Sequence, residues 1–182
     1  MFITKAARRY ASAVLELAAE RDEVQEILGD IQLIKNTLDG SNELLVFLRS
    51  PVIKYDDKAG ALKMLFGDKV QELTRLLLDQ LVRKGRIQIL DQIVEAFLKK
   101  YNEYAGIIEI DVYTARQIKE TQRKALQEAL ESKTGKKVQM QIKLDESLKG
   151  GMTVRIEDTV IDGSVKHKLE QLEEMFLAGA VE

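Results

Sequence analysis

The chain has 182 residues, 45% of them hydrophobic, and its 28 basic and 30 acidic side chains leave a net charge of -2. This balance provides no overall positive field for nucleic acid, and the absence of cysteine excludes disulfides and thiolate metal sites. The longest purely apolar run, residues 44–48, is far shorter than the roughly 18 residues that a membrane-spanning helix needs. We therefore expect two globular domains that do not enter a membrane.

Helical hydrophobic periodicity covers the first half of the chain, and glycine or proline interrupts it at intervals. It predicts six helices, over residues 4–20, 22–38, 41–50, 56–66, 68–84 and 86–104. Because every predicted helix has its own start and stop signals before Gly106, we expect residues 1–105 to form a helical bundle that folds as an independent domain.

Polar residues mark the expected helix starts. Thr4 is the expected N-cap of the first helix. Asp22 with Gln25 is an expected capping pair for the second helix, and Asp68 with Gln71 is another for the fifth. These signals predict where each helix begins.

Two of the predicted helices carry more apolar surface than one contact buries. In the first helix, apolar residues span roughly 200° of the helical wheel, and one flank of this arc contains Tyr10, Ala13 and Leu17. The main stripe of the fifth helix contains Leu73, Leu77 and Leu81. Two interpretations stay open: either the bundle buries all of this surface, or part of it forms a groove for a partner's amphipathic helix.

At Gly106 the hydrophobic period changes from that of a helix to that of a strand. Strict alternation predicts strands over residues 108–113 and 137–144. Between them we expect a helix that begins with a capping box of Thr114 and Gln117. Each strand has one apolar and one polar face, so helices are expected to cover one side of the sheet.

The end of the chain predicts a hairpin followed by a helix. Residues 152–156 and 159–161 have strand patterns, a glycine pair precedes them, and Ser164 is the expected N-cap of the last helix. We expect the apolar stripe of this helix to cover the hairpin; it consists of Val165, Leu169, Leu172 and Phe176. The second domain, residues 106–182, thus has the order β-α-β-β-β-α, and the fold class is α+β.

No constellation of residues indicates catalysis, a metal site or a cofactor. The single histidine, His167, falls on the first turn of the last helix, where a solvent-exposed role is the ordinary one. No phosphate-binding loop is present. The polar face of the predicted sheet carries Glu109, Asp111 and Glu157 instead of paired aromatic residues, which argues against binding of nucleic acid.

An ordered set of residues near the C-terminus resembles the signature of the δ subunit of bacterial F-type ATP synthases, whose mitochondrial relative is the oligomycin-sensitivity-conferring protein. The set consists of Asp145, Ser147, Leu148, Gly150, Gly151, Val154, Asp158, Val160, Ile161, Asp162, Gly163 and Ser164. The resemblance extends into the first half at Leu48, Ser50, Pro51, Ile53, Lys58, Gly85, Arg86 and Phe97. Glu146, where the family often has proline, and Glu157, where glycine is common, depart from the pattern.

This resemblance implies a non-catalytic stator subunit that links the catalytic head to the peripheral stalk, so that rotation is coupled to ATP synthesis and proton transport. The family's N-terminal bundle binds N-terminal helices of the α subunit, largely through its first and fifth helices. That implies an α-subunit groove lined by Tyr10, Ala13, Leu17, Leu73, Leu77 and Leu81. The C-terminal domain would bind the C-terminal ends of the b subunits, with a structural role for the signature residues.

The same resemblance implies a monomer within a hetero-oligomeric complex, located peripherally at the cytoplasmic face of the bacterial plasma membrane. No cofactor and no nucleic acid are expected. The start of the chain fits this expectation, because it has neither the apolar core of a signal peptide nor a transit segment. The alternative is a free-standing helical adaptor or regulator that binds another protein's amphipathic helix.

Overall fold

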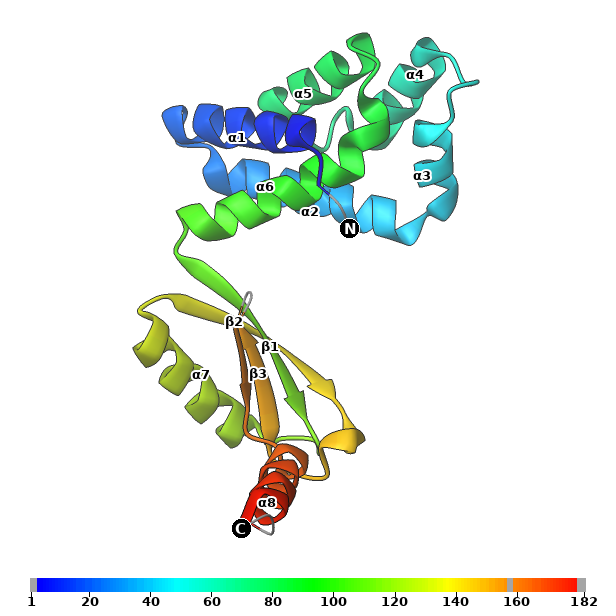
Figure 1. Cartoon of the computed structure of the whole chain (residues 1–182). Helices are drawn as coiled ribbons and strands as arrows, with labels where there is room; N and C mark the ends of the chain where they lie inside the picture. Colours follow the sequence, from blue (N-terminus) through cyan, green and yellow to red (C-terminus); the bar gives the residue numbers. More distant parts are fainter. Residues whose placement is uncertain (1–2, 157–158, 180–182) are drawn as a thin grey trace. The chain divides into compact units, whose positions relative to one another are not determined.

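The computed structural model describes residues 3–156 and 159–179 and divides into two compact units, Met1–Tyr104 and Ala105–Glu182 (Figure 1). The first unit is helical, and the second combines a sheet with helices. The predicted α+β class is therefore confirmed. Each unit has its own hydrophobic core.

Six α-helices form the first unit, as predicted. They are α1 (Lys5–Glu20), α2 (Val24–Gly40), α3 (Asn42–Arg49), α4 (Tyr55–Phe66), α5 (Glu72–Arg83) and α6 (Leu90–Tyr104), with a 3-10 turn at Ile87–Ile89 before α6. All six contribute to one core, which includes the fully buried Phe66 and Phe97. α6 packs against both α1 and α2, and α4 packs against α5. The core thus lies among α1, α2, α5 and α6, with α3 and α4 at its edge.

The start of α2 differs from the prediction. Asp22 has a left-handed backbone with φ of 57°, and its N–H donates to the carbonyl of Ala19. The N–H of Glu23 donates to the carbonyl of Ala18, so these two bonds close the C-terminus of α1. The expected capping pair of Asp22 and Gln25 is wrong, because Asp22 ends the preceding helix and α2 begins at Val24.

The start of α5 is also capped differently from the prediction. The helix begins at Glu72, and the expected pair of Asp68 with Gln71 does not form its cap. Instead Asp30 of α2, only 6% exposed, accepts hydrogen bonds at Oδ2 from the backbone N–H of Gln71 (2.8 Å) and the hydroxyl of Thr74 (2.6 Å). A buried carboxylate at the positive end of α5 satisfies donors that would otherwise be unpaired. It also joins α2 to α5.

The second unit contains a four-stranded sheet. Its elements are β1 (Ile107–Thr114), α7 (Glu120–Thr134), β2 (Lys137–Leu144), a 3-10 turn (Glu146–Leu148), β3 (Met152–Ile156), β4 (Thr159–Asp162) and α8 (Val165–Gly179). The strand order is β2-β1-β3-β4. β1 pairs in parallel with β2 and antiparallel with β3, and β3 pairs antiparallel with β4. The predicted order β-α-β-β-β-α is confirmed.

α7 covers one face of this sheet (Figure 1). The inward residues Ile110, Val112 and Val154 pack in a core with Leu130 of α7. The opposite face is polar; on it the Nζ of Lys143 lies 2.8 Å from Oδ1 of Asp111. The predicted separation into one apolar and one polar face is therefore confirmed.

The capping box expected at Thr114 is wrong. Thr114 is the last residue of β1, is buried, and is paired with both Leu144 and Met152. The helix begins six residues later, where the N–H of Lys119 donates to Oε1 of Gln122 (2.9 Å). The sheet extends through Thr114 because strands on both sides of β1 continue its hydrogen-bonding ladder.

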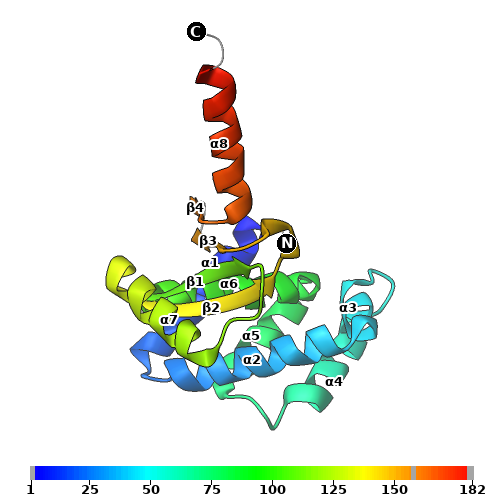
Figure 2. The same cartoon turned by 90° about the horizontal axis from the view of Figure 1, so that it is seen from below.

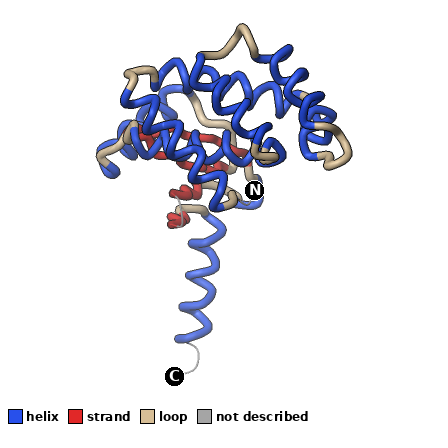
Figure 3. The backbone as a smooth tube through the Cα atoms, turned by 90° about the horizontal axis from the view of Figure 1, so that it is seen from above, coloured by secondary structure: helices blue, strands red, loops and turns tan. Residues whose placement is uncertain are grey.

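The expectation that the last helix covers the hairpin is also wrong. α8 leads away from the strands (Figures 2 and 3) and its apolar stripe is exposed, with Leu169 50% and Leu172 44% accessible. The helix that packs against the apolar face of the sheet is α7. The apolar stripe of α8 is exposed to solvent.

We predict that Asp30→Ala lowers the free energy of unfolding by about 2 to 3 kcal/mol, because the start of α5 loses its cap and Thr74 loses its buried partner. Urea unfolding followed by circular dichroism measures this change. Asp39→Ala, an exposed position on the same helix, is the control and should shift stability by less than about 0.5 kcal/mol. Equal effects of the two substitutions would show that the Asp30 cap does not stabilise the bundle.

Candidate partner-binding surfaces

The apolar arc of α1 is divided between the core and the surface. Its buried residues are Ala7, Ala11, Val14, Leu15 and Ala18. On the neighbouring flank, Tyr10 is half-buried, Ala13 is exposed and Leu17 is 41% exposed. The apolar arc of α1 is wider than one contact needs, and on this flank Ala13 and Leu17 are left exposed.

The three predicted residues of α5 lie in the core. Leu73, Leu77 and Leu81 are all buried, whereas Leu76 is 51% exposed. Successive helical residues are about 100° apart, so three consecutive leucines cannot all face one core. The residues predicted for the fifth helix did not include Leu76.

α1 and α5 are neighbours in the bundle. The guanidinium of Arg86, just beyond α5, lies 5.9 Å from the ring centroid of Tyr10, and its Nη1 lies 3.4 Å from the tyrosine hydroxyl. On the other flank of α5, α4 packs near Leu78, which is about 160° around the helix from Leu76. We call the half-buried Tyr10 together with the exposed Ala13, Leu17 and Leu76 the α1–α5 surface.

The signature residues meet where the hairpin joins α8. Gly151 has φ of 77°, and a Cβ there would lie 2.4 Å from the carbonyl oxygen of Gly163, so only glycine fits. The N–H of Val165 donates to the carbonyl of Gly150 (2.9 Å), which ties the start of α8 to the entry of β3. These contacts fix where α8 begins.

Two carboxylates of the signature organise the adjoining turns. Oδ1 of Asp162 accepts from the backbone N–H of Ser164 (2.8 Å) and from the hydroxyl of Thr153 (3.1 Å). The bond from the Ser164 backbone is the main reason that the pKa of Asp162 lies below its usual value. Oδ1 of Asp145 likewise accepts from the N–H of Ser147 (3.0 Å). Two quoted positions, Glu157 and Asp158, lie outside the described residues.

The hydroxyl of Ser164 confirms its predicted role as N-cap, because it accepts from the backbone N–H of His167 at 3.1 Å. Beyond this cap, α8 exposes a continuous apolar stripe of five side chains. They are Val165, Leu169, Leu172, Met175 and Phe176. An uncovered stripe of this size is typical of a protein-binding site.

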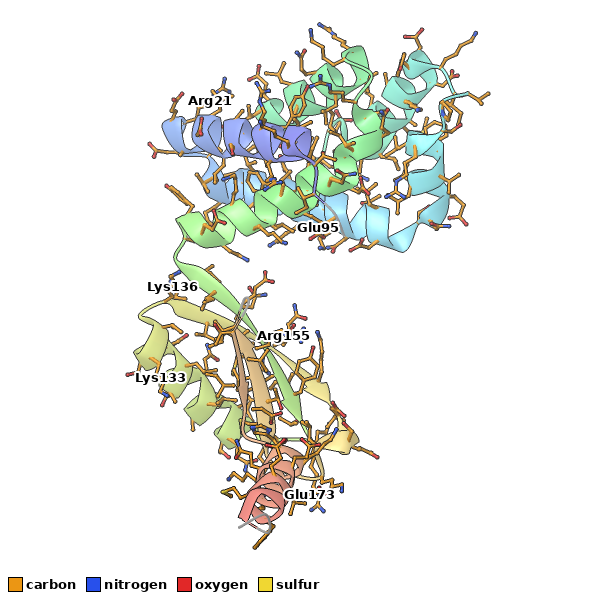
Figure 4. All side chains as sticks on the ribbon, viewed as in Figure 1. Arg21, Glu95, Lys133, Lys136, Arg155 and Glu173 are labelled. Atoms are coloured by element: carbon orange, nitrogen blue, oxygen red, sulfur yellow. The ribbon has the colours of Figure 1, made fainter. Side chains whose placement is uncertain are left out.

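Beside the start of α8, a polar depression of about 420 Å³ includes Tyr113, Arg155 and His167 (Figure 4 labels Arg155). Nε2 of His167 lies 3.0 Å from the side-chain nitrogen of Gln171. Within residues 3–156 and 159–179, no group of three His, Cys, Asp or Glu side chains is placed to hold a metal ion. None of the described helices is long and apolar enough to cross a membrane.

Comparison with known proteins places the chain in one family. The family described as "ATP synthase delta (OSCP) subunit" matches residues 6–176. The chain is 40% identical over 173 residues to ATP synthase subunit delta of Chlorobaculum tepidum, which covers 95% of this chain and 96% of that protein. It is 36% identical over 174 residues to ATP synthase subunit delta of Chloroherpeton thalassium, and this match covers 96% of this chain and 95% of that protein.

A solved structure has the same fold. A chain of the Toxoplasma gondii mitochondrial ATP synthase hexamer superposes with a TM-score of 0.72 at 23% identity, and the match covers 96% of this chain and 98% of that one. The family and the relatives confirm the resemblance that the signature predicted. The chain therefore belongs to the ATP synthase delta (OSCP) subunit family and is a non-catalytic stator component of an F-type ATP synthase.

Proposed function

We propose that this chain ties the catalytic head of the ATP synthase to its peripheral stalk, at the cytoplasmic face of a bacterial plasma membrane. The helical unit binds N-terminal helices of the α subunit, and the sheet-containing unit binds the C-terminal ends of the b subunits. The observation that supports this best is that each unit exposes an apolar surface of its own, the α1–α5 surface in one and the α8 stripe in the other.

The proposed action is mechanical. A rotating shaft changes the conformation of the head only if the head itself does not turn, so a stator must hold two partners at once. Only Ala105 and Gly106 separate α6 from β1, and a left-handed glycine (φ 64°) makes this connection. A short connection between two separately packed units suits a link that transmits force.

The α1–α5 surface fits the apolar face of an amphipathic helix. Ala13 has a small side chain that lets a partner helix approach closely, and Tyr10, Leu17 and Leu76 supply apolar contact area around it. The buried leucines of α5 take a supporting role, because they hold α5 against the bundle beneath this surface. The alternative function, a free-standing adaptor, has less support, because the relatives that match over nearly their whole length are ATP synthase subunits.

We predict that Ala13→Glu and Leu17→Asp each weaken binding of an α-subunit N-terminal peptide by about 1 to 3 kcal/mol and leave the melting temperature nearly unchanged. Leu77→Ala should do the opposite: it costs about 2 to 5 kcal/mol of stability but leaves the affinity of the folded protein intact. Isothermal titration calorimetry and thermal melting on the same samples measure both effects.

Asp39→Ala, at an exposed position of α2, is the control for this experiment and should change neither quantity. The α1–α5 surface would be excluded if the substitutions at Ala13 and Leu17 unfolded the bundle while peptide affinity per folded molecule stayed normal.

For the second unit, we predict that Leu169→Gln with Leu172→Gln weakens binding of the b subunits roughly 10- to 100-fold, because two central apolar contacts are lost. Both side chains are about half exposed, so thermal stability should hardly change. Glu170→Gln with Glu174→Gln, on the opposite face of α8, is the matched control. Binding that survives the leucine substitutions at full strength would move the b site away from the α8 stripe.

A further inference from the structure

The first two turns of α1 carry a charge distribution that the helix itself does not favour. Lys5, Arg8 and Arg9 lie near the N-terminus, and the first turn contains no acidic residue. Helix dipoles place partial positive charge at this end, so cations there are destabilising. In the described part of the chain, none of these three side chains forms an ion pair. The positive charge of these three side chains is therefore not neutralised by an ion pair in the described part of the unit.

These cations surround a shallow depression. It has a volume of about 560 Å³ and is also lined by Ser12, Ala13 and Glu16 of α1 and by Lys100 of α6. Four cations thus face one carboxylate across two neighbouring helices. Lys100 also has no ion-pair partner in the described ranges. An excess of positive charge at a helix N-terminus, without an ion pair to neutralise it, is a departure from helix electrostatics of the kind found at functional sites.

We propose that this basic depression binds an acidic segment of a partner protein. Arginine pairs with carboxylates through two parallel hydrogen bonds, and a bound carboxylate near the start of α1 also offsets the helix dipole. No aromatic or leucine side chain lines the depression. It therefore lacks the apolar anchors of a membrane-binding helix and the stacking platforms of a single-stranded nucleic-acid site.

The depression borders the α1–α5 surface at Ala13, but its cations lie on another side of α1. Lys5 lies about 140° around α1 from Tyr10, and the depression continues toward α6, whereas Tyr10 contacts Arg86 at the end of α5. The inference also stands on its own charges and does not depend on the proposed attachment to the head.

The test uses the full-length chain and a short fluorescein-labelled peptide of alanine and glutamate, followed by fluorescence anisotropy at low and at physiological salt. The variant Arg8→Gln/Arg9→Gln/Lys100→Gln removes three cations from the depression. Its control, Arg123→Gln/Lys124→Gln/Lys133→Gln, removes three exposed cations from α7 (Figure 4 labels Lys133). Both variants change the net charge equally, so they separate local binding from overall charge.

We expect the depression variant to bind the peptide at least about tenfold more weakly, and the control to remain within about twofold. The depression variant should melt at the same or a higher temperature, since repulsion at the start of α1 is relieved. If the triple variant does not fold, Lys5→Gln/Arg9→Gln repeats the comparison.

Three results would overturn the proposal. They are absence of peptide binding at low salt, equal weakening in both variants, and tighter binding of phosphatidylserine vesicles or a single-stranded oligonucleotide through the same cations.

Discussion

The four-stranded sheet has only one apolar face, and α7 covers it. This constraint determines what the rest of the second unit does. α7 and not α8 packs on the apolar face, and α8 leaves the hairpin with its stripe exposed. The signature glycines and the Ser164 cap then set the point at which α8 departs. The second unit thus buries the apolar side of α7 and exposes that of α8.

In the helical unit, too, part of the apolar surface of the helices lies outside the core. Its core accepts the alanine-rich face of α1 and the buried leucines of α5, and that leaves Tyr10, Ala13, Leu17 and Leu76 outside. Asp30 holds α2 and α5 together from within, so the exposed flank is presented by helices that are fixed in place. In both units the apolar surface that the core cannot use is the surface available for partners. This division suits a protein whose work is to hold two partners at once.

Local signals in the sequence predicted most of the elements. Thr4, Ser164 and Gly135 act within a few residues of their own position, so pattern and cap chemistry suffice to find them. The cap predictions that were wrong failed because contacts with another helix or strand decide how these residues are used. Asp30 caps a helix that begins more than forty residues later, and Asp22 serves the helix before it instead of the one after. For the candidate surfaces, the pattern showed that α1 and α5 had surplus apolar area, but only packing decides that Leu77 is core and Leu76 is not.

The claim that the chain works as a mechanical link is tested most directly by ATP-driven proton pumping in vesicles that contain the rest of the enzyme. Intact chain is compared with a mixture of two fragments, residues 1–105 and 106–182, after each fragment has been shown to fold and bind its partner. If the chain acts as a tether, the intact protein restores pumping and the two fragments together do not, although ATP hydrolysis continues. Full pumping with the separate fragments would contradict a mechanical link.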